Sequence, residues 1–231
     1  MTRTGALFVC VAALAAVSSA VSAGEEASHG AGVSLNVQRV FDATAAMTAR
    51  FTQVMESKGF GQKREASGTV TIKKPARMRW NYDDPAPLLI VADGEKLWYF
   101  DKTENIIYVE PLTGYLSARS PAMFLAGERP LAEIFDVTLS TARQEEGIVS
   151  LKLIPKEPWP GLKGALLKVD EKSFIIKQIV MVDHLGNRNT ITFSDVDTKA
   201  SPPQSMFQFT PPQGVNIQQA AKAPAPSAPA Q

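Results

Sequence analysis

One six-residue stretch decides the class of fold: Arg77-Met78-Arg79-Trp80-Asn81-Tyr82. Apolar or aromatic residues alternate strictly with polar ones along it. Since successive side chains of a β-strand point to opposite faces, Met78, Trp80 and Tyr82 share one face, and the arginines and Asn81 share the other. The stretch therefore predicts a strand with one apolar and one solvated face. The periodicity favours an apolar face that packs in an ordinary hydrophobic core over one that lines a ligand-binding cavity. It leaves both possibilities open.

Strand patterns separated by turn signals continue on both sides of this stretch. The strongest turn is Asp93-Gly94, since a two-residue hairpin loop requires backbone angles that Gly tolerates and Asp often accepts. About eleven strands are expected in all, at residues 68–73, 77–82, 88–91, 96–101, 106–110, 136–140, 148–154, 166–170, 175–182, 189–195 and 206–210.

Helical patterns occupy two regions. Apolar residues from Val33 to Val54 recur at spacings of three, four or seven, which predicts an amphipathic helix at about residues 33–48. Phe51 to Met55 also fits a strand, so the end of this helix is left open. Ser120-Pro121 has the form of a helix cap followed by proline at the first helical position, which predicts two short helices between Tyr115 and Phe135. The chain is therefore expected to be an α+β protein with a large antiparallel sheet.

The two ends of the chain differ in amino-acid composition from the region between them. Residues 1–23 combine Arg3, a short apolar run and the small residues Val21-Ser22-Ala23, the pattern of a cleavable signal peptide. Residues 24–32 are expected to form a flexible leader, and the Gln, Ala and Pro-rich residues 217–231 a disordered tail. The folded domain is then 33–216. Cys10 lies within the signal and outside any lipid-attachment context, so we expect an exported, soluble protein without disulfides.

Charge and residue types argue against several function classes. Removal of Arg3 with the signal leaves 23 basic residues (24 less one) against 23 acidic ones, which predicts no bulk attraction to nucleic acid or to an anionic membrane. The face of Arg77 and Arg79 is read as a solvated face, because the neighbouring aromatic residue points away from the charges. The two histidines, His29 and His184, cannot build a metal cluster, and no nucleophile-elbow motif is present. These residues therefore do not predict an enzyme.

Several motifs, taken together, resemble the periplasmic outer-membrane lipoprotein carrier family, LolA. They keep the order and spacing of that family over about residues 35–216, and the closing run is the most specific of them. The matching pieces are Ala49-Arg50-Phe51-Thr52-Gln53, Gly68-Thr69-Val70, Lys73-Lys74-Pro75, Met78-Arg79-Trp80-Asn81-Tyr82, Asp84-Pro85, Val91-Ala92-Asp93-Gly94, Leu97-Trp98-Tyr99-Phe100-Asp101, Ser120-Pro121, Met123-Phe124-Leu125 and Phe207-Gln208-Phe209-Thr210-Pro211-Pro212-Gln213-Gly214-Val215.

The resemblance implies an unclosed antiparallel β-barrel of about eleven strands, with a lid of three helical segments over an apolar cavity. It implies a monomeric periplasmic carrier without a cofactor. Such a carrier receives triacylated lipoproteins from an inner-membrane ABC transporter of the LolCDE type and passes them to an outer-membrane receptor of the LolB type.

The resemblance also assigns roles to individual residues. Met78 and Trp80 would face the cavity from the sheet, and Phe51 would belong to the first strand. The underside of the lid would be formed by Val37, Val40, Met123 and Leu125. Lys74 occupies the position where the family commonly has an arginine that holds the lid closed. The ammonium of lysine lacks the planar set of N–H donors that a guanidinium offers. Lys74 either holds the lid more weakly, or shares this role with Arg77 or Arg79, or is a simple surface lysine.

Two other functions remain open at this point. The same fold resembles that of periplasmic stress sensors and of carriers for other acylated envelope lipids, so the ligand could be a different lipid. A structural or adaptor protein with a filled core is the third possibility.

Overall fold

The structure, a computed structural model, describes residues 32–33, 35–112, 125–126, 130–140 and 145–219. It contains one twelve-stranded sheet in the order β12-β6-β5-β4-β3-β2-β1-β11-β10-β9-β8-β7. The strands are β1 (Ala46–Glu56), β2 (Lys63–Lys73), β3 (Arg77–Asp84), β4 (Leu88–Asp93), β5 (Lys96–Asp101), β6 (Ile106–Pro111), β7 (Phe135–Leu139), β8 (Ile148–Pro155), β9 (Gly164–Asp170), β10 (Ile176–Val182), β11 (Arg188–Asp197) and β12 (Asn216–Gln219).

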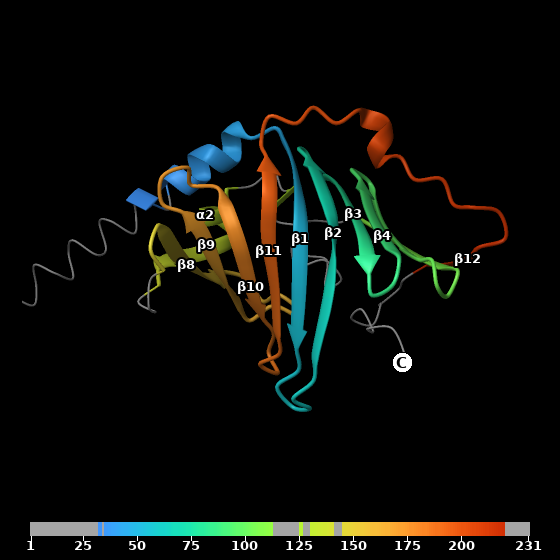
Figure 1. Ribbon diagram of the computed structural model, residues 1–231, viewed down its shortest axis with the longest axis horizontal. Helices are drawn as coiled ribbons and strands as arrows, with labels where there is room; N and C mark the ends of the chain where they lie inside the picture. Colours follow the sequence, from blue (N-terminus) through green and yellow to red (C-terminus); the bar gives the residue numbers. More distant parts are fainter. Residues whose placement is uncertain (1–31, 34, 113–124, 127–129, 141–144, 220–231) are drawn as a thin grey trace, which may run out of the picture.

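The sheet is open, because its edge strands β12 and β7 do not pair with each other. All neighbouring strands are antiparallel except β12, which pairs with β6 in parallel. Figure 1 shows β1 and β11 at the centre, with β8 to β10 on one side and β2 to β4 on the other. The expectation of a mostly antiparallel, unclosed sheet is confirmed, and the described residues hold twelve strands rather than about eleven.

Helical residues are few in the described part of the chain. Residues 32–33 and 35–43 are helical, and α2 (Leu131–Ile134) is a single turn before β7. A 3-10 turn at residues 125–126 lies in the region where two short helices were expected, and most of that region falls outside the described residues. No helix among the described residues has both the length and the apolar composition needed to cross a bilayer.

The first helix is shorter than the sequence pattern predicts. It ends at residue 43 rather than 48, and β1 begins at Ala46. The reason is the alternation that starts there: Ala49, Phe51 and Gln53 are buried, whereas Arg50 and Thr52 are exposed. A period of two is satisfied only by a strand. Phe51 therefore belongs to the first strand, as the resemblance implied.

The last expected strand, 206–210, is not a strand. Gln204–Phe207 form a 3-10 helix, η2, and the chain then continues without regular secondary structure, through a turn at Gln213-Gly214, to β12. Prolines flank this stretch at Pro202-Pro203 and Pro211-Pro212, and proline has no N–H to donate to a β-ladder. β12 itself includes residues 217–219, so the disordered tail predicted from composition at residue 217 begins too early.

The alternation predicted for β3 is confirmed. Met78 and Trp80 are buried in the main hydrophobic core and Tyr82 packs against it. Antiparallel pairing aligns Trp80 with Val70 on β2 and with Ile90 on β4, so the apolar rows of neighbouring strands lie on one face. We call this the inner face of the sheet, and the opposite one the outer face.

The outer face of β3 is less solvated than its arginines predict. The C-terminal segment returns over it, where the Arg79 Nη1 donates to the Met206 carbonyl at 3.2 Å. Burial here lowers the pKa of Arg79. Farther along, Phe209 and Val215 pack on a second apolar cluster, which consists of Leu89, Val91, Phe100 and Ile107. The outer face is thus partly covered by the protein's own chain.

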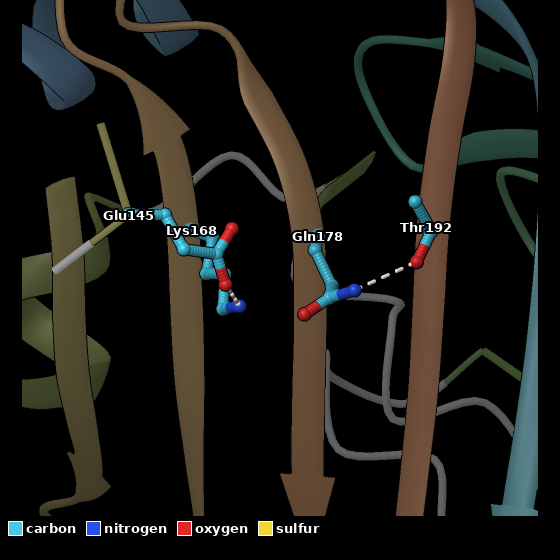
Figure 2. Close-up of polar contacts among 4 residues, drawn as sticks. All are labelled: Glu145, Lys168, Gln178 and Thr192. Atoms are coloured by element: carbon cyan, nitrogen blue, oxygen red, sulfur yellow. Dashed lines mark hydrogen bonds and ion pairs between the residues drawn. The ribbon is translucent and has the colours of Figure 1, made fainter. Parts of the chain in front are cut away.

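On the other half of the sheet the outer face carries several polar side chains. Figure 2 shows Gln178 of β10 and Thr192 of β11 pointing toward one another, with Gln178 Nε2 donating to Thr192 Oγ1 at 2.8 Å. Lys168 of β9 forms an ion pair with Glu145. Leu167 and Val169, which flank Lys168, belong to the inner core. This separation of polar and apolar faces concentrates the apolar side chains on the inner face.

Candidate functional site

The inner face carries an aromatic cluster at the centre of the sheet. The ring of Phe51 meets the rings of Trp80 and Tyr82 edge to face, with centroid separations of 4.8 and 4.9 Å. Phe193 of β11 lies 6.3 Å from Trp80, measured between ring centroids. Aromatic pairs in this geometry stabilise the folded state by more than their buried surface area alone would give. The cluster gives the inner face a large apolar surface near the middle of the sheet.

Polar groups within this interior are mostly satisfied by near neighbours. The Trp80 Nε1 lies 3.1 Å from the Met78 sulfur, and Gln53 Nε2 donates to Asn189 Oδ1 at 2.9 Å. Burial is the main cause that raises the pKa of Tyr82, and electrostatic repulsion from ionised Tyr99 raises it further. The Tyr82 hydroxyl therefore stays neutral at physiological pH. The interior is therefore apolar and uncharged around the aromatic cluster.

Short helical pieces pack against the inner face. They contribute the buried residues Val33, Val37, Leu125, Ala126, Leu131 and Ile134 to the same core cluster as Trp80. The Leu131 N–H donates to Gln38 Oε1 at 2.7 Å, which joins α2 to the first helix. The Ala76 N–H donates to the Ala126 carbonyl at 2.9 Å, which joins the 125–126 turn to the loop between β2 and β3. These hydrogen bonds link the pieces to each other and to one end of the sheet.

Lys74 provides a further link between the sheet and the first helix. Its Nζ donates to the carbonyl of Phe41 and lies 3.6 Å from the centroid of the Phe41 ring. Phe41 is in the last turn of the helix, where the unpaired carbonyls favour a cation. The backbone N–H of Lys74 also donates to the Ala45 carbonyl at 2.9 Å. A single residue thus joins the β2–β3 loop to the end of the helix by two hydrogen bonds and one cation–π contact.

Burial lowers the pKa of the Lys74 ammonium, and the nearby carboxylate of Asp42 opposes part of that shift. Partial desolvation strengthens the electrostatic attraction between this ammonium and its partners, because the surrounding dielectric constant is lower than that of water. Arg77 and Arg79, the other candidates for this position, lie elsewhere: Arg77 Nη1 donates to the Pro75 carbonyl and Arg79 to the C-terminal segment.

The structure brings most of the sequence-predicted residues together. Val37, Met78, Trp80 and Leu125 belong to one buried cluster. Val40 is half-buried on the first helix, and its carbonyl accepts a hydrogen bond from Thr44 Oγ1 at 2.7 Å. Met123 lies outside the described residues.

Sequence reasoning missed several residues of this interior. Phe41 was absent from the predicted set, although it lies four residues after Val37 on the same helical stripe. Phe193 lies in a strand that was predicted, and its alternation with Ile191 was the available signal. Trp159 stacks on Phe135 with centroids 5.8 Å apart. It comes from the loop between β8 and β9, where no periodicity indicates burial.

The described residues contain no group of three or more His, Cys, Asp or Glu side chains placed to hold a metal ion. The chemistry that this interior offers is the burial of apolar surface, under helical pieces held at their edges by a few hydrogen bonds.

Comparison with known proteins gives the family. The family model "Outer membrane lipoprotein carrier protein LolA" matches residues 42–210. An outer-membrane lipoprotein carrier protein of Methylobacillus flagellatus is 30% identical over 184 residues, 79% of this chain and 86% of that protein. One from Dechloromonas aromatica is 30% identical over 174 residues, 75% of this chain and 81% of that protein.

A solved structure supports the fold independently. The crystal structure of an uncharacterized conserved protein from Thermus thermophilus has a TM-score of 0.53 to this chain, at 11% identity and with coverage of 83% of this chain and 99% of that one. The family model covers most of the domain that carries the inner face and the helical pieces packed on it. This chain belongs to the LolA family of outer-membrane lipoprotein carrier proteins.

Proposed function

We propose that this protein is a periplasmic carrier that binds the acyl chains of lipoproteins released from the inner membrane and delivers them to an outer-membrane receptor. The observation that carries the proposal is an apolar inner face against which short helical pieces pack. Relatives with about 30% identity that are named outer-membrane lipoprotein carriers support the same function.

The energetics of the cargo explain why a carrier needs such an interior. Burial stabilises an acyl chain by about 0.8 kcal/mol per methylene, so three long chains in water would cost tens of kcal/mol. A protein that moves them through an aqueous compartment must cover them. It must also release them, which favours a cover that detaches at moderate cost over a rigid pocket.

In this proposal the first helix, the 125–126 turn and α2 form the lid. Val37, Val40, Met123 and Leu125 contact the acyl chains from the lid, and Met78 and Trp80 contact them from the sheet. Lys74 acts as the latch, because its bonds to Phe41 hold the end of the first helix against the β2–β3 loop. Without cargo, the side chains of lid and sheet pack against one another.

The proposal implies two protein partners and one compartment. An ABC transporter of the LolCDE type would load the carrier, and a receptor of the LolB type would unload it. Both steps require export, cleavage of residues 1–23 and a protein that diffuses freely between two membranes. No catalytic step is needed for this cycle.

Uptake of cargo tests the function directly. Purified protein is added to proteoliposomes that contain the transporter and a triacylated lipoprotein, and ATP is supplied. We expect the lipoprotein to appear in the supernatant as a soluble complex with the carrier. Recovery of phospholipid alone, or of no lipid, would contradict the proposal.

Two neighbouring residues of β1 locate the binding face. A photo-crosslinking phenylalanine analogue replaces Phe51, which points to the inner face, or Thr52, which is exposed on the outer face. We expect the lipoprotein to crosslink to the first variant and not to the second. Equal crosslinking at both positions would place the cargo elsewhere.

A further inference from the structure

Two exposed apolar side chains stand at the tips of adjacent hairpins. Phe60, between β1 and β2, is 84% exposed, and Leu185, between β10 and β11, is 80% exposed. The other large apolar residues exposed in the described part of the chain, Leu35, Ile217 and Ile154, have exposed fractions of 66%, 48% and 39%. Exposing such side chains in water costs free energy, so two of them together at one end of the molecule indicate an interaction site.

The two hairpins lie side by side and are tied to each other. β1 pairs with β11 as far as Glu56 and Arg188, next to both turns. Beyond that pair, the Lys58 N–H donates to Asn187 Oδ1 at 3.0 Å. Figure 1 shows both turns projecting at the end of the sheet opposite the first helix. The two apolar tips are therefore presented together, away from the first helix.

Each tip is held in shape by its own hydrogen bonds. In the first hairpin the Ser57 N–H donates to the Gln62 carbonyl and the Gly61 N–H to the Ser57 carbonyl, both at 2.9 Å. In the second, Asp183 Oδ1 accepts from the N–H groups of Leu185 and Asn187 at 2.9 and 2.8 Å. Phe60 and Leu185 thus protrude from ordered turns, which lowers the entropic cost of using them for binding.

Three cations lie in or next to the two tips. Residues 57–63 and 184–188 include Lys58, Lys63 and Arg188, whereas the carboxylates of Glu56 and Asp183 lie directly behind the two tips, where Asp183 accepts hydrogen bonds from its own turn. Lys63 is paired with Glu65 at 3.1 Å, on the strand behind the tip. A Cβ on Gly186 would lie 2.8 Å from the Cδ of Lys58, so the stem of Lys58 crosses the second turn. The tips therefore combine two apolar side chains with a positive charge.

From these observations we infer that the paired hairpin tips, Phe60 and Leu185 with Lys58, Lys63 and Arg188, form a contact site for an anionic lipid bilayer. Aromatic and aliphatic side chains insert at the boundary between headgroups and acyl chains, and lysine and arginine bind anionic headgroups. A stable protein partner would require about 800 Å² of complementary surface on each side, whereas two separate tips offer little. Insertion of two side chains is weak and reversible, which suits a protein that must leave the membrane again.

The site is separate from the proposed cargo-binding interior. It contains no residue of the inner face, and its test requires no cargo, transporter or receptor. The lipid contact and the carrier function can therefore fail independently of each other.

Flotation with vesicles tests the inference. Purified protein is mixed with vesicles of phosphatidylcholine that contain phosphatidylglycerol, or with phosphatidylcholine alone. We expect binding to the anionic vesicles that decreases with added salt. The double variant Phe60→Ser/Leu185→Ser should lower the partition coefficient by about tenfold or more, and Lys58→Gln/Arg188→Gln by about tenfold.

Leu35→Ser is the matched control, because Leu35 is also exposed but lies on the first helix at the opposite end of β1. Its binding should equal that of the unsubstituted protein. The inference is overturned if the unsubstituted protein does not bind either kind of vesicle, if the double variant binds normally, or if Leu35→Ser weakens binding equally.

Fluorescence gives a second readout that does not depend on loss of binding. The chain has three tryptophans, of which Trp80 and Trp159 are buried. In Phe60→Trp, the new indole should shift its emission to the blue on anionic vesicles and should be quenched by brominated lipid, whereas Leu35→Trp should show neither effect. Contact of this tip with an envelope protein, without either signal on vesicles, would mean that the partner is a protein and not lipid.

Discussion

Phe51 of β1 and Tyr82 of β3 are in ring contact across an intervening strand, with centroids 4.9 Å apart. Both residues pair with Gly68 of β2, which lies between them on the inner face. A Cβ on Gly68 would collide with the backbone of Asn81, so only glycine lets β2 and β3 approach this closely beneath the two rings. The aromatic cluster of the inner face therefore depends on a glycine that contributes no side-chain contact.

Substitution of Gly68 by alanine should disrupt this arrangement. A Cβ at this position would lie 1.9 Å from the backbone oxygen of Asn81, and a backbone atom cannot move aside at low cost. We expect Gly68→Ala to lower the free energy of unfolding by about 3 kcal/mol or more, measured by urea denaturation. The control is Gly59→Ala, where nothing lies within 4 Å of the added Cβ. Equal stability of the two variants would contradict the close approach.

Removal of the Lys74 ammonium should loosen the first helix. Lys74→Met keeps the length of the side chain but removes its hydrogen bond to the Phe41 carbonyl and its contact with the Phe41 ring. The expected cost is about 1 kcal/mol. Amide hydrogen exchange should become faster in residues 35–43 and stay unchanged in β9 and β10. Lys74→Arg should restore much of the protection, and faster exchange throughout the sheet would indicate general destabilisation instead.

The titration of Lys74 gives a separate test. Burial holds the pKa of this ammonium below its ordinary value of 10.5 in the folded protein. Between the folded-state pKa and 10.5 the unfolded chain binds more protons, so the contribution of Lys74 to the free energy of unfolding should rise with pH across that window. NMR of the labelled lysine side chain measures the value. Asp42→Asn should lower the pKa further, and a pKa at or above 10.5 in the intact protein would contradict the burial of Lys74.

Asp93 should stabilise the β4–β5 hairpin in a pH-dependent manner. Burial would raise its pKa, but hydrogen bonds from the Trp98 Nε1 and from the N–H groups of Lys96 and Glu95 outweigh this and lower the pKa below 3.8. This stabilisation is present above pH 3.8 and is lost as the pH falls through the folded-state pKa. Asp93→Asn should therefore unfold more easily at neutral pH, with a difference that shrinks in acid. Urea denaturation at neutral and acidic pH checks the stability of Asp93→Asn. Trp98→Phe should raise the pKa of Asp93, which NMR titration of this carboxyl group checks.

Much of the sheet could be predicted from residue order, because alternation and turns are local. Ten of the eleven expected strands were found where they were expected, and the Asp93-Gly94 turn joins β4 to β5 as predicted. The errors lie where two local patterns compete. The helical stripe of the first helix continues into β1 at Met47, Phe51 and Val54, so spacing alone placed the helix end too late.

Part of the candidate site was visible in the same way. The inner-face positions Met78 and Trp80 follow from alternation, and Val37 follows from helical spacing. Trp159 could not be predicted, because a loop has no periodicity to show which side chain turns inward. The hydrogen-bond acceptor of Lys74 could not be predicted either. It is the backbone carbonyl of Phe41, and every residue carries a backbone carbonyl, so the sequence does not indicate which one is used.

The sequence by itself determined which face of each strand is apolar, because side-chain alternation follows from the geometry of a single strand. Only the tertiary structure decided what covers those faces. Arg79 was expected to be solvated, yet it donates to the Met206 carbonyl 127 residues away. Phe60 and Leu185 are likewise far apart in the chain and become neighbours only because β1 pairs with β11. Contacts of this kind depend on the path of the whole chain, and no local pattern of residues encodes that path.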